Sequence, residues 1–202
     1  MNRLRELSSK VMDVYQTLSN EFSAYQQAQS LNCVAKCGAC CNNPDIEVSP
    51  LEMLPYALYL FDSGQADQKY NELGDYNGFS CMQYQRLSLD GKEGFCGIYE
   101  YRPSICRMFG AAGYKTKFGV ATLSVCKPIK SSVPDKYSQA LIAMESGATK
   151  PPMLAIGRQK IAQLDFELGE KLMPINEALR YILDKVLTLS YYQGNIDDFV
   201  AA

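Results

Sequence analysis

The stretch Cys33-Val-Ala-Lys-Cys37-Gly-Ala-Cys40-Cys41 places four thiols within nine residues. Its glycine and polar residues are typical of a loop rather than of a packed helix or strand. Another four cysteines are dispersed over the middle of the chain: Cys81, Cys96, Cys106 and Cys126. The 202-residue chain contains no histidine, which excludes Ser–His and Cys–His hydrolase chemistry and removes the commonest metal ligand.

The rest of the composition is that of an ordinary globular protein, with 47% hydrophobic and 21% charged residues. The 20 basic and 22 acidic residues give a net charge of −2 and form no basic stripe, so we expect no nucleic acid partner. No apolar run approaches the roughly 20 residues needed to cross a bilayer. Residues 1–6 also lack the features of a secretory signal. These patterns predict a cytoplasmic protein without a membrane partner.

Three interpretations of the cysteines compete. Disulfides are disfavoured because cytoplasmic thiols are kept reduced and a chain of this length buries a core without them. Burial as small hydrophobic residues suits Cys126 in a strand but not four thiols in a polar loop. Metal ligation explains the clustering, the loop and the compartment together. We therefore expect all eight cysteines to ligate metal, in one or two sites: Cys33, Cys37, Cys40, Cys41, Cys81, Cys96, Cys106 and Cys126.

The choice between iron–sulfur and zinc depends on spacing. Structural zinc sites built from cysteines usually show two short Cys-x-x-Cys turns, whereas this chain has one tight cluster. An iron–sulfur cluster accepts ligands from a short loop plus distant thiols. An iron–sulfur cluster is thus favoured and zinc is the alternative. The spacing Cys33-x-x-x-Cys37-x-x-Cys40 also matches the radical SAM signature, but a long predicted helix precedes it where that fold has a strand.

Two motifs carry a family resemblance. They are Cys37-Gly-Ala-Cys40-Cys41 and Gly94-Phe-Cys96-Gly-Ile-Tyr99-Glu-Tyr-Arg102-Pro103-Ser-Ile-Cys106-Arg107-Met-Phe109. Over about residues 31–126 the chain resembles the YkgJ-type cysteine-cluster family, described as a zinc- or iron-chelating domain. It departs from the family pattern in having three residues, rather than two, between Cys33 and Cys37. The family is distantly similar to flagellin lysine N-methylases, and enzymatic activity follows only from that likeness.

Arg102 and Arg107 flank Cys106 in the second motif. A guanidinium beside a thiolate-bound cluster would offset its negative charge, so both arginines are candidates for binding the metal group. Pairing with surface carboxylates is the alternative for each. We expect Arg107 in particular to support metal retention, with alanine more damaging than lysine at this position.

The predicted fold is α+β and mainly helical, with terminal helices around a loop- and hairpin-rich, metal-stapled cysteine core. Its segments are an amphipathic helix (1–30), a metal-binding domain (31–130) and a C-terminal helical region (131–202) packed on it as one unit. An apolar stripe over residues 3–28 predicts that the first helix packs on the rest of the protein. Further helices are predicted at 49–62, 65–73, 134–146, 155–170 and 174–193, helical turns at 103–109, and strands at 81–89, 94–99 and, as a pair, 112–126.

These observations predict a metal-binding protein that holds an iron–sulfur cluster in a structural, carrier or sensing role. One alternative is an iron–sulfur-dependent enzyme similar to a protein lysine methyltransferase. The other is a structural zinc module whose terminal helices bind a protein partner that the sequence does not identify.

Overall fold

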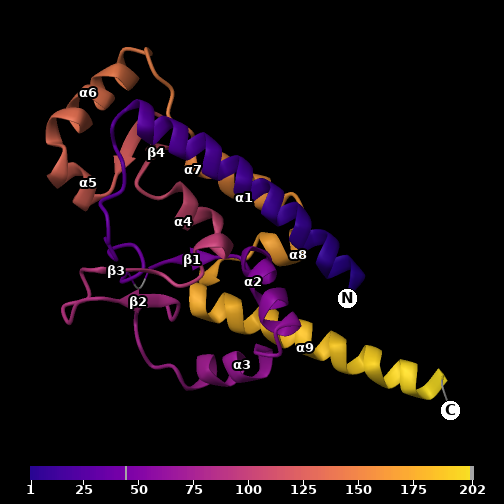
Figure 1. The fold of residues 1–202 in the computed structure, drawn as a ribbon. Helices are drawn as coiled ribbons and strands as arrows, with labels where there is room; N and C mark the ends of the chain where they lie inside the picture. Colours follow the sequence, from indigo (N-terminus) through magenta and orange to yellow (C-terminus); the bar gives the residue numbers. More distant parts are fainter. Residues whose placement is uncertain (44, 201–202) are drawn as a thin grey trace.

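The computed structural model describes residues 1–43 and 45–200, with side chains as far as Tyr192. The chain begins with α1 (Asn2–Ala28), the long indigo helix of Figure 1. The predicted stripe is confirmed, because its members are all buried: Leu4, Leu7, Val11, Tyr15, Leu18, Phe22 and Tyr25. They face α2 (Pro50–Asp62), α4 (Ser104–Met108) and α7 (Leu154–Ala162).

The central helix of the main core is α2, which packs between α1 and the long C-terminal helix α9 (Ile175–Val200). Most of its residues are buried because it has neighbours on several sides. Ser49 precedes it, and the backbone N–H of Ser49 donates to the Glu52 carboxylate at 2.8 Å, which confirms the predicted helix start. After a turn at Gly64, where φ is +70°, α3 (Ala66–Asp75) packs against α9.

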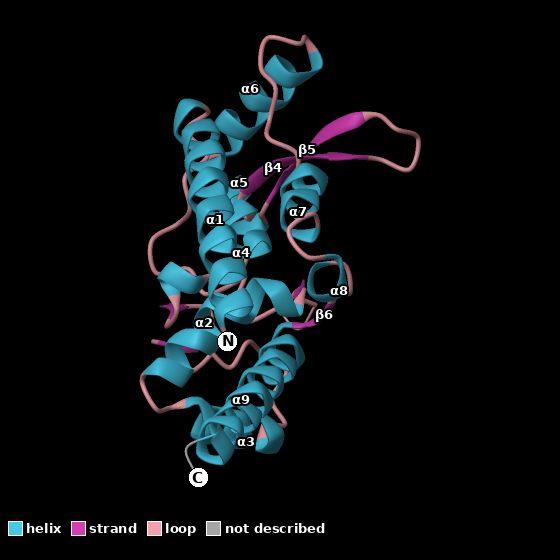
Figure 2. Ribbon diagram, turned by 90° about the vertical axis from the view of Figure 1, so that its right-hand side faces the viewer, coloured by secondary structure: helices cyan, strands magenta, loops and turns pink. Residues whose placement is uncertain are grey.

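In residues 1–43 and 45–200 the strands form three separate antiparallel pairs. Their bounds are β1 (Glu47–Val48) with β6 (Met173–Pro174), β2 (Tyr84–Arg86) with β3 (Gly94–Cys96), and β4 (Ala111–Lys115) with β5 (Ala121–Val125). The tip of the β4–β5 hairpin projects beyond the helices (Figure 2). The fold is thus mainly helical α+β, as predicted.

Strands β2 and β3 are shorter than the sequence predicts. The Leu87 N–H still donates to the Glu93 carbonyl at 2.8 Å. Beyond it, polar side chains replace the backbone contacts: the Ser88 hydroxyl donates to Asp90 at 2.7 Å and accepts from the Glu93 N–H at 3.0 Å. Gly91 has a φ of +67°, which closes the loop. The hairpin therefore ends in a wide, hydrogen-bonded loop rather than a two-residue turn.

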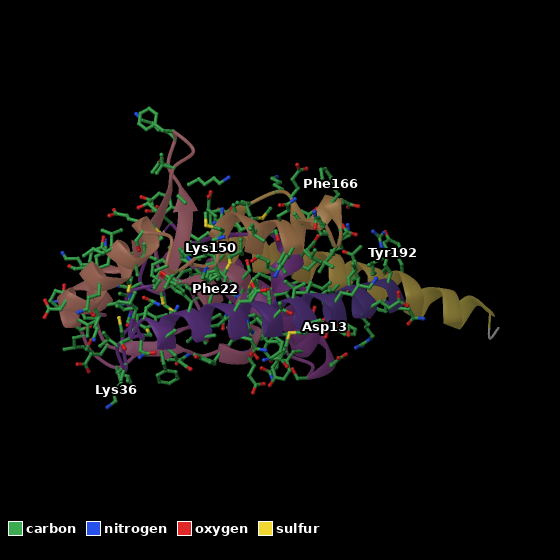
Figure 3. The ribbon with its side chains drawn as sticks, turned by 90° about the horizontal axis from the view of Figure 1, so that it is seen from above. Asp13, Phe22, Lys36, Lys150, Phe166 and Tyr192 are labelled. Carbon is green, nitrogen blue, oxygen red and sulfur yellow. The ribbon has the colours of Figure 1, made fainter. Side chains whose placement is uncertain are left out.

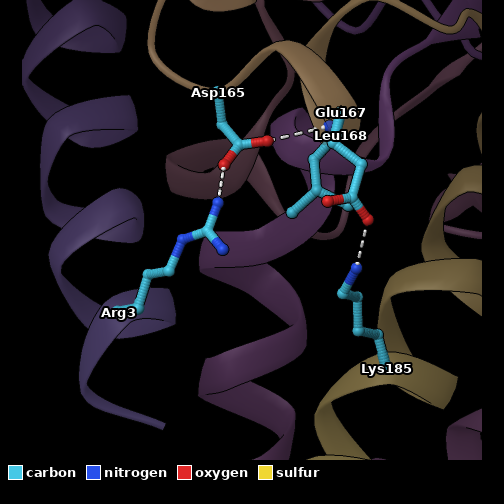
Figure 4. Close-up of polar contacts among 5 residues, drawn as sticks. All are labelled: Arg3, Asp165, Glu167, Leu168 and Lys185. Atoms are coloured by element: carbon cyan, nitrogen blue, oxygen red, sulfur yellow. Dashed lines mark hydrogen bonds and ion pairs between the residues drawn. The ribbon is translucent and has the colours of Figure 1, made fainter.

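The predicted single helix over 155–170 is wrong. The chain breaks into α7 and the short α8 (Phe166–Gly169) because the Asp165 carboxylate accepts from the Leu168 N–H at 3.0 Å and starts a new helix. Arg3 of α1 contacts the same carboxylate at 2.6 Å, and Lys185 of α9 contacts Glu167 at 2.7 Å. Figure 4 shows these residues together. These contacts join α8 to both terminal helices.

Two helices follow the second hairpin, α5 (Lys127–Ser132) and α6 (Pro134–Glu145). The sequence predicted α6 but not α5. Both pack with the end of α1 in a smaller apolar cluster around Leu31 and Ile129. None of the helices in residues 1–43 and 45–200 combines the length and apolar character that crossing a bilayer requires.

Candidate metal centre

The cysteine loop lies between α1 and β1 and pairs with the β2–β3 hairpin through its backbone. The Gly38 N–H donates to the Lys92 carbonyl at 3.2 Å, and the Gly94 N–H donates to the Lys36 carbonyl at 2.9 Å. Lys36 itself lies at the edge of the molecule (Figure 3). These bonds bring the loop beside β3, whose last residue is Cys96.

Gly38, directly after Cys37, allows the loop to approach the hairpin closely. A Cβ atom at Gly38 would lie 1.8 Å from the hydroxyl oxygen of Tyr84. Tyr84 is buried and its hydroxyl donates to the Gly91 carbonyl at 2.8 Å, so it has little room to withdraw. The glycine of the first motif is therefore required by packing.

The thiols of Cys40, Cys41 and Cys96 interact with one another. Hydrogen bonding with the Cys41 thiol lowers the pKa of Cys40 to about 6 and that of Cys96 to about 7. The pKa of Cys41 is raised because its proton is shared in these hydrogen bonds. A thiol from the loop and a thiol from the hairpin thus belong to one network.

Cys81 and Cys106 complete what we call the inner thiols, together with Cys41 and Cys96. The N–H of Cys81 donates to the Cys41 carbonyl at 3.0 Å. Burial raises the pKa of Cys81 to about 11 and that of Cys106 well above its usual value, and the charges of Cys40 and Cys96 add to both shifts. Both thiols therefore lie within electrostatic reach of the thiol network.

The outer thiols are Cys33, Cys37 and Cys126. Partial desolvation raises the pKa of Cys33 and that of Cys126, and the neighbouring charges of Cys37 and Cys40 raise both further. Cys40 thus neighbours both the inner and the outer thiols. All eight predicted cysteines lie in one region of the molecule.

The donor set fits a metal–thiolate group in its chemistry, since soft thiolates suit zinc and iron–sulfur alike. In the described ranges 1–43 and 45–200, however, no three His, Cys, Asp or Glu side chains form a group that could hold a metal ion. The thiols are gathered but do not converge as ligands. Two buried N–H groups in the same region, Gln83 Nε2 and Arg102 Nε, have no hydrogen-bond acceptor among the described atoms, and they would suit a negatively charged group beside them.

Arg102 influences more of the thiols than Arg107, whose charge interacts with Cys106. The positive charge of Arg102 favours the thiolate form of four cysteines from both sets: Cys33, Cys40, Cys96 and Cys106. The guanidinium lies 3.7 Å from the centroid of the Tyr99 ring. This contact holds the charge in place beside the cluster.

Arg107 is occupied by other partners. Its Nε donates to the Arg102 carbonyl at 2.7 Å, and its Nη1 donates to the Ser19 hydroxyl of α1 at 2.9 Å. A third bond goes to the Glu100 carbonyl, and the guanidinium lies 4.5 Å from the centroid of the Tyr15 ring. Arg107 therefore connects the second motif to α1. Among the described residues, no salt bridge of 4.0 Å or less joins Arg102 or Arg107 to a carboxylate.

Glu52 lies in the first turn of α2, and it also positions α4. One carboxylate oxygen accepts from the N–H and hydroxyl of Ser49, and the other accepts from the N–H of Ser104 at 2.9 Å and from its hydroxyl. Glu52 is 3% exposed. Ser104 lies two residues before Cys106, so this carboxylate fixes the helical turn that presents an inner thiol. The sequence signal was Ser104 as a helix-start residue, but its partner lies 52 positions away.

A cavity of about 260 Å³ borders Cys81, one of the inner thiols. Cys81 and Ser80 line one part of it, and Asn176 and Arg180 of α9 line another. Asn176 donates to the Ser80 carbonyl at 3.0 Å and accepts from the Met82 N–H at 2.9 Å. The segment that carries Cys81 is therefore anchored to α9.

Residues 32–127 match the model of the CxxCxxCC family, whose description reads "Putative zinc- or iron-chelating domain". The match covers all eight cysteines and both arginines of the second motif. Searches of the curated proteins and of the solved structures found no match to the chain.

Proposed function

We propose that the protein uses its eight thiols to hold an iron–sulfur cluster, because residues 32–127 match the model of the CxxCxxCC cysteine-cluster family. The observation that carries the proposal is the backbone pairing that brings distant cysteine segments to the loop: the Cys81 N–H donates to the Cys41 carbonyl at 3.0 Å, and the Gly94 N–H donates to the Lys36 carbonyl at 2.9 Å. It joins segments that are distant in sequence, as cluster ligation requires. Arg102 supplies the opposing charge within reach of the thiols.

The neighbour relations support two sets of four ligands. The inner thiols form one set: Cys41, Cys81, Cys96 and Cys106. The outer thiols form the other with Cys40: Cys33, Cys37, Cys40 and Cys126. Adjacent Cys40 and Cys41 would then direct their sulfurs to different sites. Bound metal would supply a redox-active or a purely structural centre, while the chain contributes the thiolates, the charge of Arg102 and the shielding of the inner set.

Iron–sulfur is favoured over zinc because the ligands come from one tight loop and several distant positions, rather than from two short turns. The absence of histidine leaves a thiolate-only donor set. All eight cysteines are free thiols, a state that suits a reducing compartment such as the cytoplasm. A carrier or sensing role is supported by the partial exposure of the outer set, since Cys33 is exposed.

Purification without oxygen, followed by metal and acid-labile sulfide analysis, tests this proposal. We expect a brown protein that contains iron and sulfide in equal amounts. A colourless protein with stoichiometric zinc would establish the structural zinc module instead. A protein that neither carries metal nor takes it up on reconstitution would contradict both.

A further inference from the structure

The tip of the β4–β5 hairpin stands clear of the rest of the molecule. Residues 116–120 connect the two strands beyond the helices (Figure 2), and Figure 3 shows the same projection from above. The Thr116 N–H donates to the Val120 carbonyl at 2.9 Å, and the Gly119 N–H donates to the Thr116 carbonyl at 2.9 Å. Gly119 has a φ of +78°, and a Cβ atom there would meet nothing within 4 Å. The tip is therefore a turn that is closed by its own backbone bonds and has open space around it.

The apex of this turn is apolar. Phe118 is 80% exposed and Val120 is 62% exposed. Neither belongs to an apolar cluster of residues 1–43 and 45–200, so their burial does not stabilise the fold. Tyr114, in β4 just before the turn, is also exposed. Single apolar side chains scattered over a surface need no explanation, but three of them on one projecting hairpin indicate a contact site.

The same hairpin is positively charged. Lys115 and Lys117 are exposed, and Lys117 Nζ lies 5.0 Å from the centroid of the Phe118 ring. Among the described residues, no salt bridge of 4.0 Å or less joins either lysine of the hairpin to a carboxylate. The range 101–134 contains no Asp or Glu, although acidic residues outnumber basic ones in the whole chain. The hairpin therefore carries a positive charge that no neighbouring carboxylate pairs with.

An apolar apex beside lysines fits a partner that is apolar inside and negatively charged at its surface. An anionic bilayer has these layers in this order, because its acyl chains lie beneath phosphate headgroups. Apolar side chains can enter the boundary between the two layers while lysines extend to the headgroups. The backbone bonds of the turn lower the cost of entry, since an unpaired N–H or C=O is costly in an apolar medium. An acidic protein would supply the charge, but it would also need a pocket for the projecting apex.

We propose that the tip of the β4–β5 hairpin docks the protein on an anionic membrane surface. Phe118 and Val120 enter the interface. Lys115 and Lys117 contact the lipid phosphates. The sequence-based expectation of no membrane partner rested on the lack of a spanning segment and of a secretory signal, and docking on a surface needs neither. The strength of such docking scales with the apolar area buried and with the charge of the lipids, so a tip of this size binds reversibly.

A fluorescent reporter at the tip tests the proposal directly. The chain contains no tryptophan, so Phe118→Trp places a single one at the apex. Phe166→Trp is the matched control, because Phe166 is 72% exposed and lies in α8, outside the hairpin. Each full-length protein is mixed with vesicles of phosphatidylcholine, with or without phosphatidylserine. We expect the emission of Phe118→Trp to shift to the blue, and to be quenched by brominated acyl chains, only with phosphatidylserine. The emission of Phe166→Trp should not change.

Vesicle sedimentation then separates the apex from the lysines. Phe118→Ser should lower the partition coefficient about tenfold, because the largest apolar side chain of the tip is lost. Lys115→Ser/Lys117→Ser should lower it by about tenfold or more at low salt and by less at high salt, because salt screens the attraction. The control Lys10→Ser/Lys171→Ser removes the same charge from exposed positions outside the hairpin and should match the wild type. Circular dichroism should be unchanged in every variant, since all of these side chains are exposed.

Wild-type protein that does not sediment with phosphatidylserine vesicles would overturn the proposal. Equal sedimentation of the wild type and every variant would overturn it as well, because the contact would then lie elsewhere. Equal binding to vesicles without phosphatidylserine would contradict the role of the lysines and of the anionic surface. An emission shift of Phe118→Trp with soluble poly-glutamate, but not with vesicles, would replace the membrane by an acidic protein partner.

Discussion

The helical frame of α1, α2 and α9 and the cysteine region over residues 31–126 are stabilised in different ways. The frame buries a continuous apolar core in which Val11, Leu54 and Ile182 are fully shielded from solvent. The cysteine region, by contrast, leaves some large apolar side chains exposed to solvent: Phe79 is 64% exposed and Phe95 is 53% exposed. The frame therefore depends on apolar burial, whereas the cysteine region depends on backbone pairing, a buried carboxylate and, on our proposal, metal.

The largest expected effect comes from removing the metal. Chelation or oxidative loss should make residues 31–126 sensitive to protease, because the thiol contacts alone do not replace metal–sulfur bonds. The terminal helices should keep much of their circular dichroism, since apolar packing stabilises them. Limited proteolysis with mass spectrometry measures the difference. Cleavage that is unchanged after complete metal removal would show that the cysteine region is stable by itself.

Glu52→Ala should have the next largest effect because this residue joins the two regions. The substitution leaves the N–H groups of Ser49 and Ser104 without their charged acceptor and should lower the free energy of unfolding by about 3 kcal/mol. Metal retention should fall as well, since the turn before Cys106 loses its anchor. Urea denaturation measures the first effect and chelator competition the second.

Glu21→Ala is the control for Glu52, because it removes a partly exposed carboxylate that contacts Lys160 at 2.8 Å. It should cost less than about 1 kcal/mol and leave metal retention unchanged. Similar losses in both variants would mean that Glu52 does not connect the frame to the metal site.

Gly38→Ala should disturb the cysteine region alone. The new methyl group overlaps the Tyr84 hydroxyl, so the loop must move away from the hairpin, at a cost typical of overpacking, about 1–3 kcal/mol. Metal content should fall. Gly74→Ala is the control: its methyl would lie 3.5 Å from the nearest Arg180 atom, and a helical alanine is neutral or stabilising by up to about 1 kcal/mol. Normal metal content in Gly38→Ala would contradict the close approach of loop and hairpin.

The two arginines should show the smallest and most selective effects. Arg102→Ala should speed metal loss about tenfold, because it removes the charge that favours the thiolate form of several cysteines. Arg107→Ala should mainly lower the free energy of unfolding, because Arg107 bonds Ser19 and two backbone carbonyls. Chelator kinetics and urea denaturation separate the two effects. Faster metal loss from Arg107→Ala than from Arg102→Ala would instead support the sequence-based expectation for Arg107.

Local signals in the sequence predicted the frame well. The apolar stripe of α1 and the Ser49–Glu52 start of α2 depend on residues three or four positions apart, so they can be read directly. The break between α7 and α8 was missed because the apolar period continues through it, while Asp165 competes for the backbone. The pairing of β1 with β6 was missed because the two-residue strands are far apart in the sequence: Glu47 pairs with Pro174, 127 positions away.

In the candidate site too, local sequence signals predicted some features and missed those that depend on tertiary packing. Cysteine spacing predicted which residues gather, and the structure places all eight thiols in one region. The sequence did not predict the contact of Glu52 with Ser104, the unpaired amide of Gln83, or the different surroundings of Arg102 and Arg107. Each of these depends on side chains that meet only after the loop, the hairpin and α1 have packed together.

The most direct test of the central claim is cysteine alkylation of the metal-loaded and the metal-free protein, mapped by mass spectrometry. If all eight thiols ligate metal, each of them should be protected in the loaded protein, and the exposed Cys33 is the most telling because burial alone would not protect it. Removal of metal should then make Cys33 and the rest of the loop reactive. Alkylation of Cys33 and Cys126 at equal rates in both states, with metal still bound, would contradict ligation by all eight cysteines.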